Sequence, residues 1–214
     1  MKKVNLIPMA GNGQRFVNEG YNTPKPLINI DGIPMVIKAA KCLPKADKWI
    51  FLCRYDHVKN SDIKEILEQF FPGSIVIQVK SLTEGQVNTC LLAKEYMNPD
   101  DQLTIGACDN GMEYEQKVLE KSITNMDVVI WTFRNHKAVL KNPNMYGWID
   151  LNNKGYVKKV SCKVPISNNV IEDHAVLGAF TFKKAEYFFK YAQKIIKKNR
   201  RVNNEFYLDV LVDE

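Results

Sequence analysis

The sequence predicts an α/β fold: a doubly wound, mostly parallel, Rossmann-like sheet flanked by helices, with a β-hairpin elaboration in the second half. Three observations lead to this prediction. Short apolar runs rich in Val and Ile recur along the first 130 residues, and amphipathic stretches separate them. After residue 131 the pattern changes to alternating apolar and polar residues. Uninterrupted apolar runs are typical of strands buried on both faces of a parallel sheet.

We expect the strands of the first half at apolar runs that are flanked by turn residues. These runs are VNLIPMA from residue 4, KWIFLC from 48, SIVIQV from 74, QLTIGAC from 102 and DVVIWTF from 127. Helical patterns lie between them at residues 35–43, 61–71, 87–97 and 113–123. Ser61 is the expected N-cap of the second helix, which Pro72 and Gly73 should end. In such folds ligands bind beyond the carboxyl ends of the strands.

The second half is expected to extend the same sheet. Residues 146–163, YGWIDLNNKGYVKKVSCK, alternate around an Asn-Asn-Lys-Gly turn and predict a hairpin. A further strand at 175–182 precedes a helix from 184 to about 198. The basic run at 194–201 should be a solvated helix face. No linker or repeat interrupts the chain, so we expect a single domain over residues 1–214.

Composition narrows the classes of function. The chain has 214 residues, 45% hydrophobic and 25% charged, and a net charge of +6, which suits an anionic ligand rather than nucleic acid. It has no signal peptide pattern and no apolar run near the ~18 residues of a membrane span. Its five scattered cysteines include no C-x-x-C pair, which indicates reduced thiols. We therefore expect a cytoplasmic protein that binds neither nucleic acid nor membranes.

The loop after the first strand has the chemistry of a phosphate site. It contains Gly11-x-Gly13, but Phe16 stands where the dinucleotide fingerprint needs a third glycine, and the Gly-Lys-Ser/Thr of a Walker A loop is absent. What remains is a glycine-rich turn whose backbone N–H groups can face a phosphate, accompanied by Arg15 and Lys25. Arginine offers a planar fork for phosphate oxygens, and lysine offers a movable point charge. The prolines on both sides of Lys25 restrict the backbone, so less conformational entropy is lost when the lysine is held toward a phosphate.

The signature MAGNGQRF followed by PKPLINIDGIPMV resembles a family of nucleotidyltransferases, the sugar-1-phosphate pyrophosphorylases. These enzymes make nucleotide sugars and related activated alcohols from an NTP and a phosphorylated substrate. The resemblance covers nearly the whole chain. It implies a nucleotide-binding part at 1–130 and an acceptor-binding part at 131–214. The small size of the chain and its Asp109-Asn110 pair, which resembles that of thymidylyltransferases, favour a pyrimidine NTP.

The resemblance also implies roles for individual residues. Ala10, Gly11 and Gly13 would bind the triphosphate, Arg15 would neutralise the leaving pyrophosphate, and Lys25 would bind the α-phosphate in the transition state. Gly85 would let the base approach the backbone, and Gln86 would hydrogen-bond its edge. Asn110 would contact the substrate, and the acceptor pocket would include Gly147, Lys163 and Gly178. Lys163 matches the lysine of a Glu-Lys-Pro segment that binds the acceptor phosphate, but Cys162 and Val164 replace the flanking residues of that segment.

The resemblance implies Mg²⁺ as the cofactor. Asp109 in TIGACDNG matches the metal-binding aspartate, and Asp209 in NEFYLD is assigned as the second ligand, with Glu205 as its rival. Two carboxylates from distant strands suit a hard cation shared with triphosphate oxygens. The acceptor phosphate is already an anionic nucleophile, so no general base is needed. The three histidines lie far apart in sequence and indicate no catalytic cluster.

Two other functions stay open. A GT-A type glycosyltransferase shares the α/β plan but typically uses an Asp-x-Asp motif, whereas this chain has Asp109-Asn110-Gly111. That function would also leave Arg15 and Lys25 unexplained. A non-catalytic nucleotide-binding module is the other alternative, because the chain ends five residues after Asp209 and members of the family usually continue.

Overall fold

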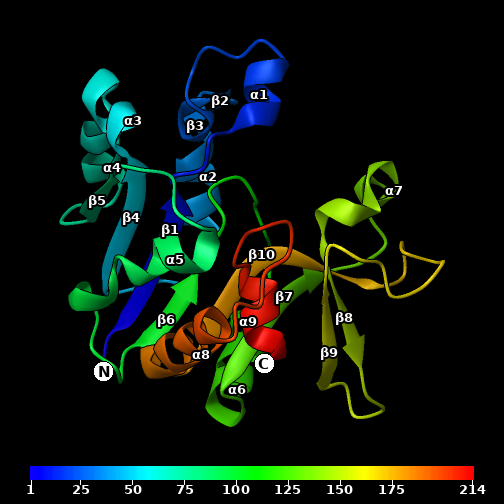
Figure 1. The fold of residues 1–214 in the computed structure, drawn as a ribbon. Helices are drawn as coiled ribbons and strands as arrows, with labels where there is room; N and C mark the ends of the chain where they lie inside the picture. Colours follow the sequence, from blue (N-terminus) through cyan, green and yellow to red (C-terminus); the bar gives the residue numbers. More distant parts are fainter.

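A mixed sheet of eight strands forms the centre of the computed structural model, which describes all 214 residues (Figure 1). Four neighbouring strands are parallel, in the order β5 (Ile75–Val79), β4 (Lys48–Arg54), β1 (Lys3–Met9) and β6 (Gln102–Ile105). Strand β10 (His174–Phe182) is antiparallel to β6, and β7 (Val128–Phe133) and β8 (Gly147–Leu151) are antiparallel to β10. Six strands therefore run in one direction, and only β10 and β9 (Val157–Cys162) run in the other. The predicted α/β fold and its hairpin are confirmed.

The sheet forks along β10. Its second half pairs with β6 through Phe180 to Phe182, whereas its first half pairs with β8 through His174 and Ala175. Strand β7 follows β10 through both halves, with a register shift between Val176 and Phe180. Gly178 lies within this bulge at φ +88°, a backbone conformation that favours glycine. Since β7 takes one edge of β10, β6 and β8 share the other and separate around Gly178.

Helices cover both faces of the parallel half. Helices α2 (Met35–Lys41) and α4 (Ile63–Phe70) pack on one face, and α5 (Gln86–Leu91), α8 (Ala185–Lys197) and α9 (Leu208–Asp213) pack on the other. Successive strand residues point to opposite faces. Leu6 and Ile7 of β1 are both fully buried, each in a different one of the two core clusters. Burial on both faces explains why the strands are apolar without alternation.

The remaining elements are short, except for the ten-residue helix α6. They are α1 (Gln14–Asn18), η1 (Lys25–Leu27), the β2 (Asn29–Ile30) and β3 (Ile33–Pro34) pair, α3 (Tyr55–Asn60), η2 (Lys94–Tyr96), α6 (Gln116–Asn125), α7 (Ala138–Lys141) and η3 (Pro143–Met145). The helix predicted at 87–97 is divided into α5 and η2. The N-cap prediction for Ser61 is wrong, because its hydroxyl donates to the His57 carbonyl and closes α3. Asp62 precedes α4 instead.

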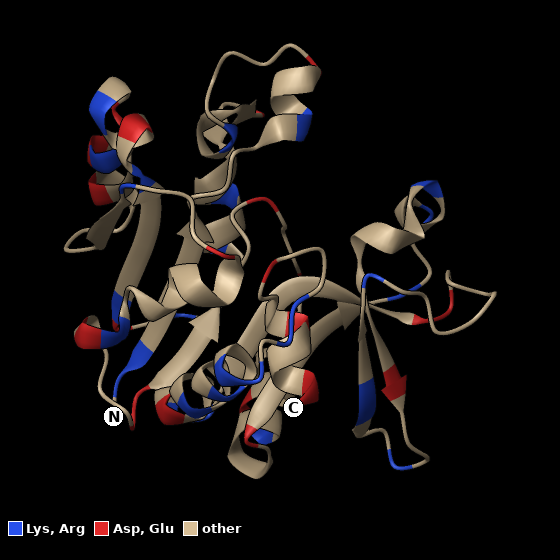
Figure 2. Ribbon diagram, viewed as in Figure 1, with Lys and Arg blue, Asp and Glu red and all other residues tan.

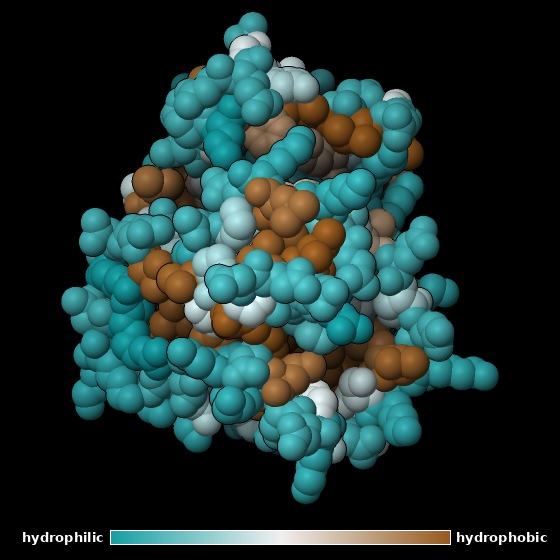
Figure 3. Space-filling model, turned by 90° about the vertical axis from the view of Figure 1, so that its right-hand side faces the viewer, coloured by the Kyte–Doolittle hydropathy of each residue, from teal (hydrophilic) through white to brown (hydrophobic).

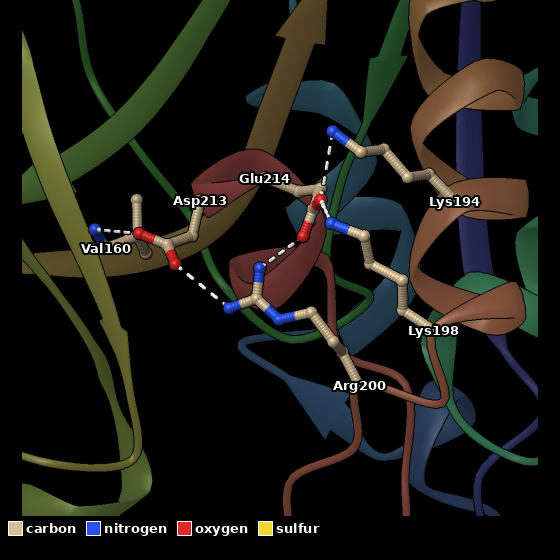
Figure 4. A network of polar contacts seen from close by, with 6 residues as sticks. All are labelled: Val160, Lys194, Lys198, Arg200, Asp213 and Glu214. Carbon is tan, nitrogen blue, oxygen red and sulfur yellow. Dashed lines mark hydrogen bonds and ion pairs between the residues drawn. The ribbon is translucent and has the colours of Figure 1, made fainter.

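The basic run at 194–201 does more than face solvent, because three of its cations meet one carboxylate. Lys194, Lys198 and Arg200 all pair with Glu214 (Figure 4). Arg200 also contacts Asp213, at 3.2 Å, and the second Asp213 oxygen accepts the Val160 N–H at 2.9 Å. Figure 2 shows the corresponding basic and acidic segments of α8 and α9 near the C-terminus. These contacts fix α9 to α8 and to β9.

Neither the cysteines nor the surface points to a particular function. All five cysteines are free. No helix is both long enough and apolar enough to cross a bilayer. Seen from the side of the β8–β9 hairpin, apolar patches lie between hydrophilic residues (Figure 3).

Candidate functional site

Two adjoining cavities lie over the carboxyl ends of β1 and β6, where the sheet forks. The larger has a volume of about 740 Å³ and takes residues from both halves of the chain. The smaller, of about 420 Å³, lies along the opening loop. Of the residues predicted from sequence, the larger cavity is lined by Arg15, Lys25, Gln86, Asp109, Asn110, Gly147, Lys163, Gly178 and Asp209. The smaller is lined by Ala10, Gly11, Gly13 and Gly85, together with Arg15, Lys25, Gln86, Asp109 and Gly178. The fold thus brings every predicted site residue to one place.

The opening loop is held in shape from both sides. Gly13 has φ +62° and precedes α1, and a Cβ added to it would lie 3.3 Å from the Cβ of Lys25. Asn12 accepts a hydrogen bond from Arg54 at the end of β4, and Arg54 also pairs with Asp56 at 2.7 Å. The Asn12 side chain therefore ties the loop to the neighbouring strand.

Lys25 crosses the cavity to the end of β6. Its Nζ lies 2.5 Å from the Asp109 carboxylate and 5.5 Å from the centre of the Phe16 ring. Both side chains of the pair are about three-quarters or more buried, with 19% and 27% of their surface exposed. The adjacent Asn110 donates to the carbonyl of Leu177 at the fork. The loop after β6 is therefore fixed to β10 as well as to Lys25.

Asp209 lies on a helix, not on the strand that the sequence predicted. It is in the first turn of α9, and its carboxylate lies against the backbone of Gly147. A Cβ at position 147 would come within 2.6 to 2.8 Å of the carboxylate atoms, so this approach requires glycine. Burial raises the pKa of Asp209 to about 6, although Lys163 and a hydrogen bond from Cys162 act in the opposite direction.

Lys163 follows β9 in a conformation that is uncommon for a residue with a side chain, at φ +63°. Its backbone N–H donates to the Tyr146 carbonyl at 3.1 Å, and its Nζ donates to the Met145 carbonyl and lies 5.3 Å from the centre of the Tyr207 ring. Arg15 reaches the same segment from the opposite half, with its Nη1 3.3 Å from the Met145 sulfur. Backbone strain at a cavity is typical of a functional site.

Gly85 has a packing role that the sequence did not indicate. A Cβ added there would lie 2.6 Å from the Phe206 nitrogen and 2.7 Å from its oxygen, and the backbone has φ +120°. On either side of Gly85, the Phe206 N–H donates to Glu84 and the Val87 N–H donates to Phe206. The glycine therefore lets the segment before α9 join the loop that opens α5.

We predict that Gly85→Ala lowers the free energy of unfolding by about 2 kcal/mol or more, because the added methyl overlaps backbone that cannot turn away. Gly20→Ala is the control, since Gly20 has φ +89° but no atom within 4 Å of an added Cβ. Denaturant titration measures both variants. An equal loss in the two would mean that backbone strain, not contact with Phe206, makes glycine necessary.

Sequence reasoning missed part of the larger cavity. Its additional polar and aromatic lining includes Glu19, Phe133, Arg134, His136, Tyr146 and Tyr207. The available signal was position: the RNH segment at 134–136 directly follows the apolar run that forms β7. Loops after parallel strands are where this class of fold binds ligands.

Comparisons with known proteins show which fold this is. Neither a family model nor a curated protein matches the sequence. Among solved structures, a nucleoside-diphosphate-sugar pyrophosphorylase from Vibrio cholerae matches 98% of this chain and 86% of its own, with a TM-score of 0.76 at 18% identity. The inositol-1-phosphate CTP transferase from T. maritima matches 99% of this chain and 80% of its own, with a TM-score of 0.73 at 13% identity.

A third structure extends the same pattern. A Bacillus anthracis protein described as a glucose-1-phosphate thymidylyltransferase has a TM-score of 0.71 at 15% identity, over 98% of this chain and 80% of its own. The three similar proteins are nucleotidyltransferases by description, and each aligns along almost the whole of this chain. The chain therefore has the fold of the sugar-phosphate nucleotidyltransferases.

Proposed function

We propose that this protein is a Mg²⁺-dependent nucleotidyltransferase that condenses an NTP, preferably a pyrimidine NTP, with a phosphorylated sugar or other small phosphorylated alcohol. The products are an NDP-activated compound and pyrophosphate. One observation carries the proposal: Lys25, Asp109, Lys163 and Asp209 come from four separate segments and line one cavity at the fork of the sheet. The fold shared with nucleotidyltransferases supports the reaction class, and we place the enzyme in cytoplasmic nucleotide-sugar biosynthesis.

The two cavities divide the substrates. Residues 1–130 supply the smaller cavity almost entirely, and we assign the NTP to it, with Ala10, Gly11 and Gly13 at the triphosphate and Gly85 and Gln86 near the base. Residues 131–214 supply much of the larger cavity, which we assign to the acceptor. Lys25 and Asp109 line both cavities and stand where the two substrates would meet.

The residues present fit a magnesium ion. Asp109 and Asp209 offer hard oxygen donors in the same cavity. Two carboxylates leave the other positions to phosphate and water, which Mg²⁺ prefers. The buried Asp209 carboxylate, with its raised pKa, would gain from a nearby cation. When bound, Mg²⁺ would neutralise charge on the triphosphate and orient it.

The chain's own residues then act by position and charge. An oxygen of the acceptor phosphate attacks the α-phosphorus, and the bond from that phosphorus to the bridging oxygen of the leaving pyrophosphate breaks. Lys163 holds the incoming phosphate, Lys25 stabilises charge on the α-phosphate, and Arg15 neutralises the pyrophosphate. Phosphate is an anion at neutral pH and requires no general base, which agrees with a site whose polar lining is mainly cations and carboxylates.

The two alternatives fit the geometry less well. A GT-A type glycosyltransferase typically uses an Asp-x-Asp motif, but here Asn110 and Gly111 follow Asp109. The Asn110 amide donates to the Leu177 carbonyl. A non-catalytic nucleotide-binding module would need only the smaller cavity. Lys163 and Asp209 line the larger cavity and not the smaller one, so that function leaves both residues unexplained.

A coupled pyrophosphate assay tests the proposal. With Mg²⁺, each of CTP, UTP, dTTP, ATP and GTP, and a panel of phosphorylated sugars and polyols, we expect release of pyrophosphate with a pyrimidine NTP, and none when EDTA removes the metal. Calorimetry of NTP binding accompanies it. Silence across the panel with NTP binding intact would favour the binding module, and faster turnover with a purine NTP would overturn the base preference.

A further inference from the structure

Arg134 is an unused cation in the acceptor cavity. The other cationic side chains that line this cavity have partners: Lys25 pairs with Asp109, Lys163 donates to the Met145 carbonyl, and Arg15 contacts the Met145 sulfur. The Arg134 guanidinium makes no hydrogen bond or ion pair within the chain, although it lines the same cavity. A guanidinium offers a planar set of donors that matches a carboxylate or a phosphate.

The loop that carries Arg134 is fixed at both ends. Phe133 before it pairs with Ala175 in the sheet, and the N–H of Asn135 after it donates to the Ile171 carbonyl at 2.7 Å. Asn135 has φ +57°, a left-handed conformation that Asn adopts more readily than most residues. The backbone on both sides of Arg134 is therefore held, and the exposed Arg134 side chain projects from an ordered turn.

His136 adds a second donor to this turn. Its Nδ1 accepts the backbone N–H of Ala138 at 3.2 Å, so the proton of the neutral ring lies on Nε2. The imidazole packs edge-on against Phe133, with ring centres 6.1 Å apart, and lines the same cavity. Asp173 accepts the Ser167 hydroxyl at 2.7 Å and forms no ion pair with Arg134.

We propose that Arg134, with His136, binds a second anionic group of the acceptor, a carboxylate or a further phosphate, apart from the phosphate that Lys163 holds. This inference rests on the proposed function, because it treats the larger cavity as the acceptor site. A cation without a partner in a ligand cavity discriminates in favour of anions and against cations. The acceptor is thus a sugar acid phosphate or a bisphosphate rather than a neutral sugar phosphate or a phosphorylated amine.

Matched acceptors test this by binding alone. Calorimetry on the protein with Mg²⁺ and α,β-methylene-CTP compares glucose 1-phosphate with glucuronic acid 1-phosphate and glucose 1,6-bisphosphate, and glycerol 3-phosphate with 3-phosphoglycerate. We expect at least one acidic member to bind about tenfold or more tightly than its neutral partner. The uronic acid and bisphosphate arms show whether a carboxylate or a phosphate is preferred, and phosphocholine should bind most weakly.

Variants assign the preference to Arg134. Arg134→Gln should remove it and leave the neutral acceptors within about twofold, whereas Arg134→Lys should keep part of it. Lys141→Ala is the control, because Lys141 is an exposed cation of α7 that lies outside the cavity lining. Equal affinity for both members of each pair, or an equal loss for both in Arg134→Gln, would overturn the inference. The readout requires no turnover, so a protein that keeps the preference but releases no pyrophosphate would refute the proposed function alone.

Discussion

Lys25→Ala is expected to lower kcat by about 10²-fold or more while the Kd of the NTP changes by less than about threefold. We assign Lys25 to the α-phosphate, where charge develops as the bond to pyrophosphate breaks. An interaction made mainly in the transition state lowers kcat and kcat/KM together, whereas a ground-state phosphate contact mainly raises KM. Steady-state kinetics and calorimetry of NTP binding measure the two effects separately.

Lys38→Ala is the matched control. Lys38 lies 2.5 Å from Asp31, the same separation as between Lys25 and Asp109, but its ion pair is more exposed and it lines neither cavity. Its removal should leave turnover unchanged and shift stability by less than about 0.5 kcal/mol. If folded Lys25→Ala protein turned over at the wild-type rate, the role of Lys25 in the transition state would be wrong.

Asp209→Asn is expected to lower the activity of the protein and to raise its stability in the absence of metal. Turnover with Mg²⁺ should fall by about 10²-fold or more, because one of the two carboxylates for the metal is lost. The metal-free variant should unfold less readily than the wild type at pH 8. Burial raises the pKa of Asp209 from 3.8 to about 6, so its charged form costs the fold on the order of 3 kcal/mol above pH 6.

The pH dependence has a definite sign. The pKa of Asp209 is higher in the folded protein, so the stability that this group contributes is fully present below pH 3.8 and is lost as the pH rises through about 6. Denaturant titrations in EDTA between pH 4 and 8 should show this loss in the wild type and not in Asp209→Asn. Glu205→Gln is the control, because Glu205 lines only the smaller cavity. Loss of Mg²⁺-dependent turnover in Glu205→Gln alone would transfer the metal role to Glu205.

The sequence by itself determined the α/β class and most of the elements. Apolar runs such as that of β1 are buried on both faces, so their composition alone separated them from helices and loops. The turn at 152–155 likewise fixed the hairpin. The N-cap prediction failed at Ser61 because two local hydrogen bonds compete there: the hydroxyl donates to the His57 carbonyl four residues earlier and closes α3, so it does not cap α4.

In the candidate site, too, some residues could be identified from the sequence and others only from the tertiary structure. The glycines and cations of the opening loop were identifiable because phosphate binding leaves a local pattern of residues. Only the tertiary structure decided that Asp209 lies on a helix against Gly147, because that contact joins residues 62 positions apart. Arg134 has no motif around it, and its place in the cavity follows from the fork of β10 at Gly178. A sheet that divides around one bulge brings loops from both halves together, and no local pattern in the sequence encodes that meeting.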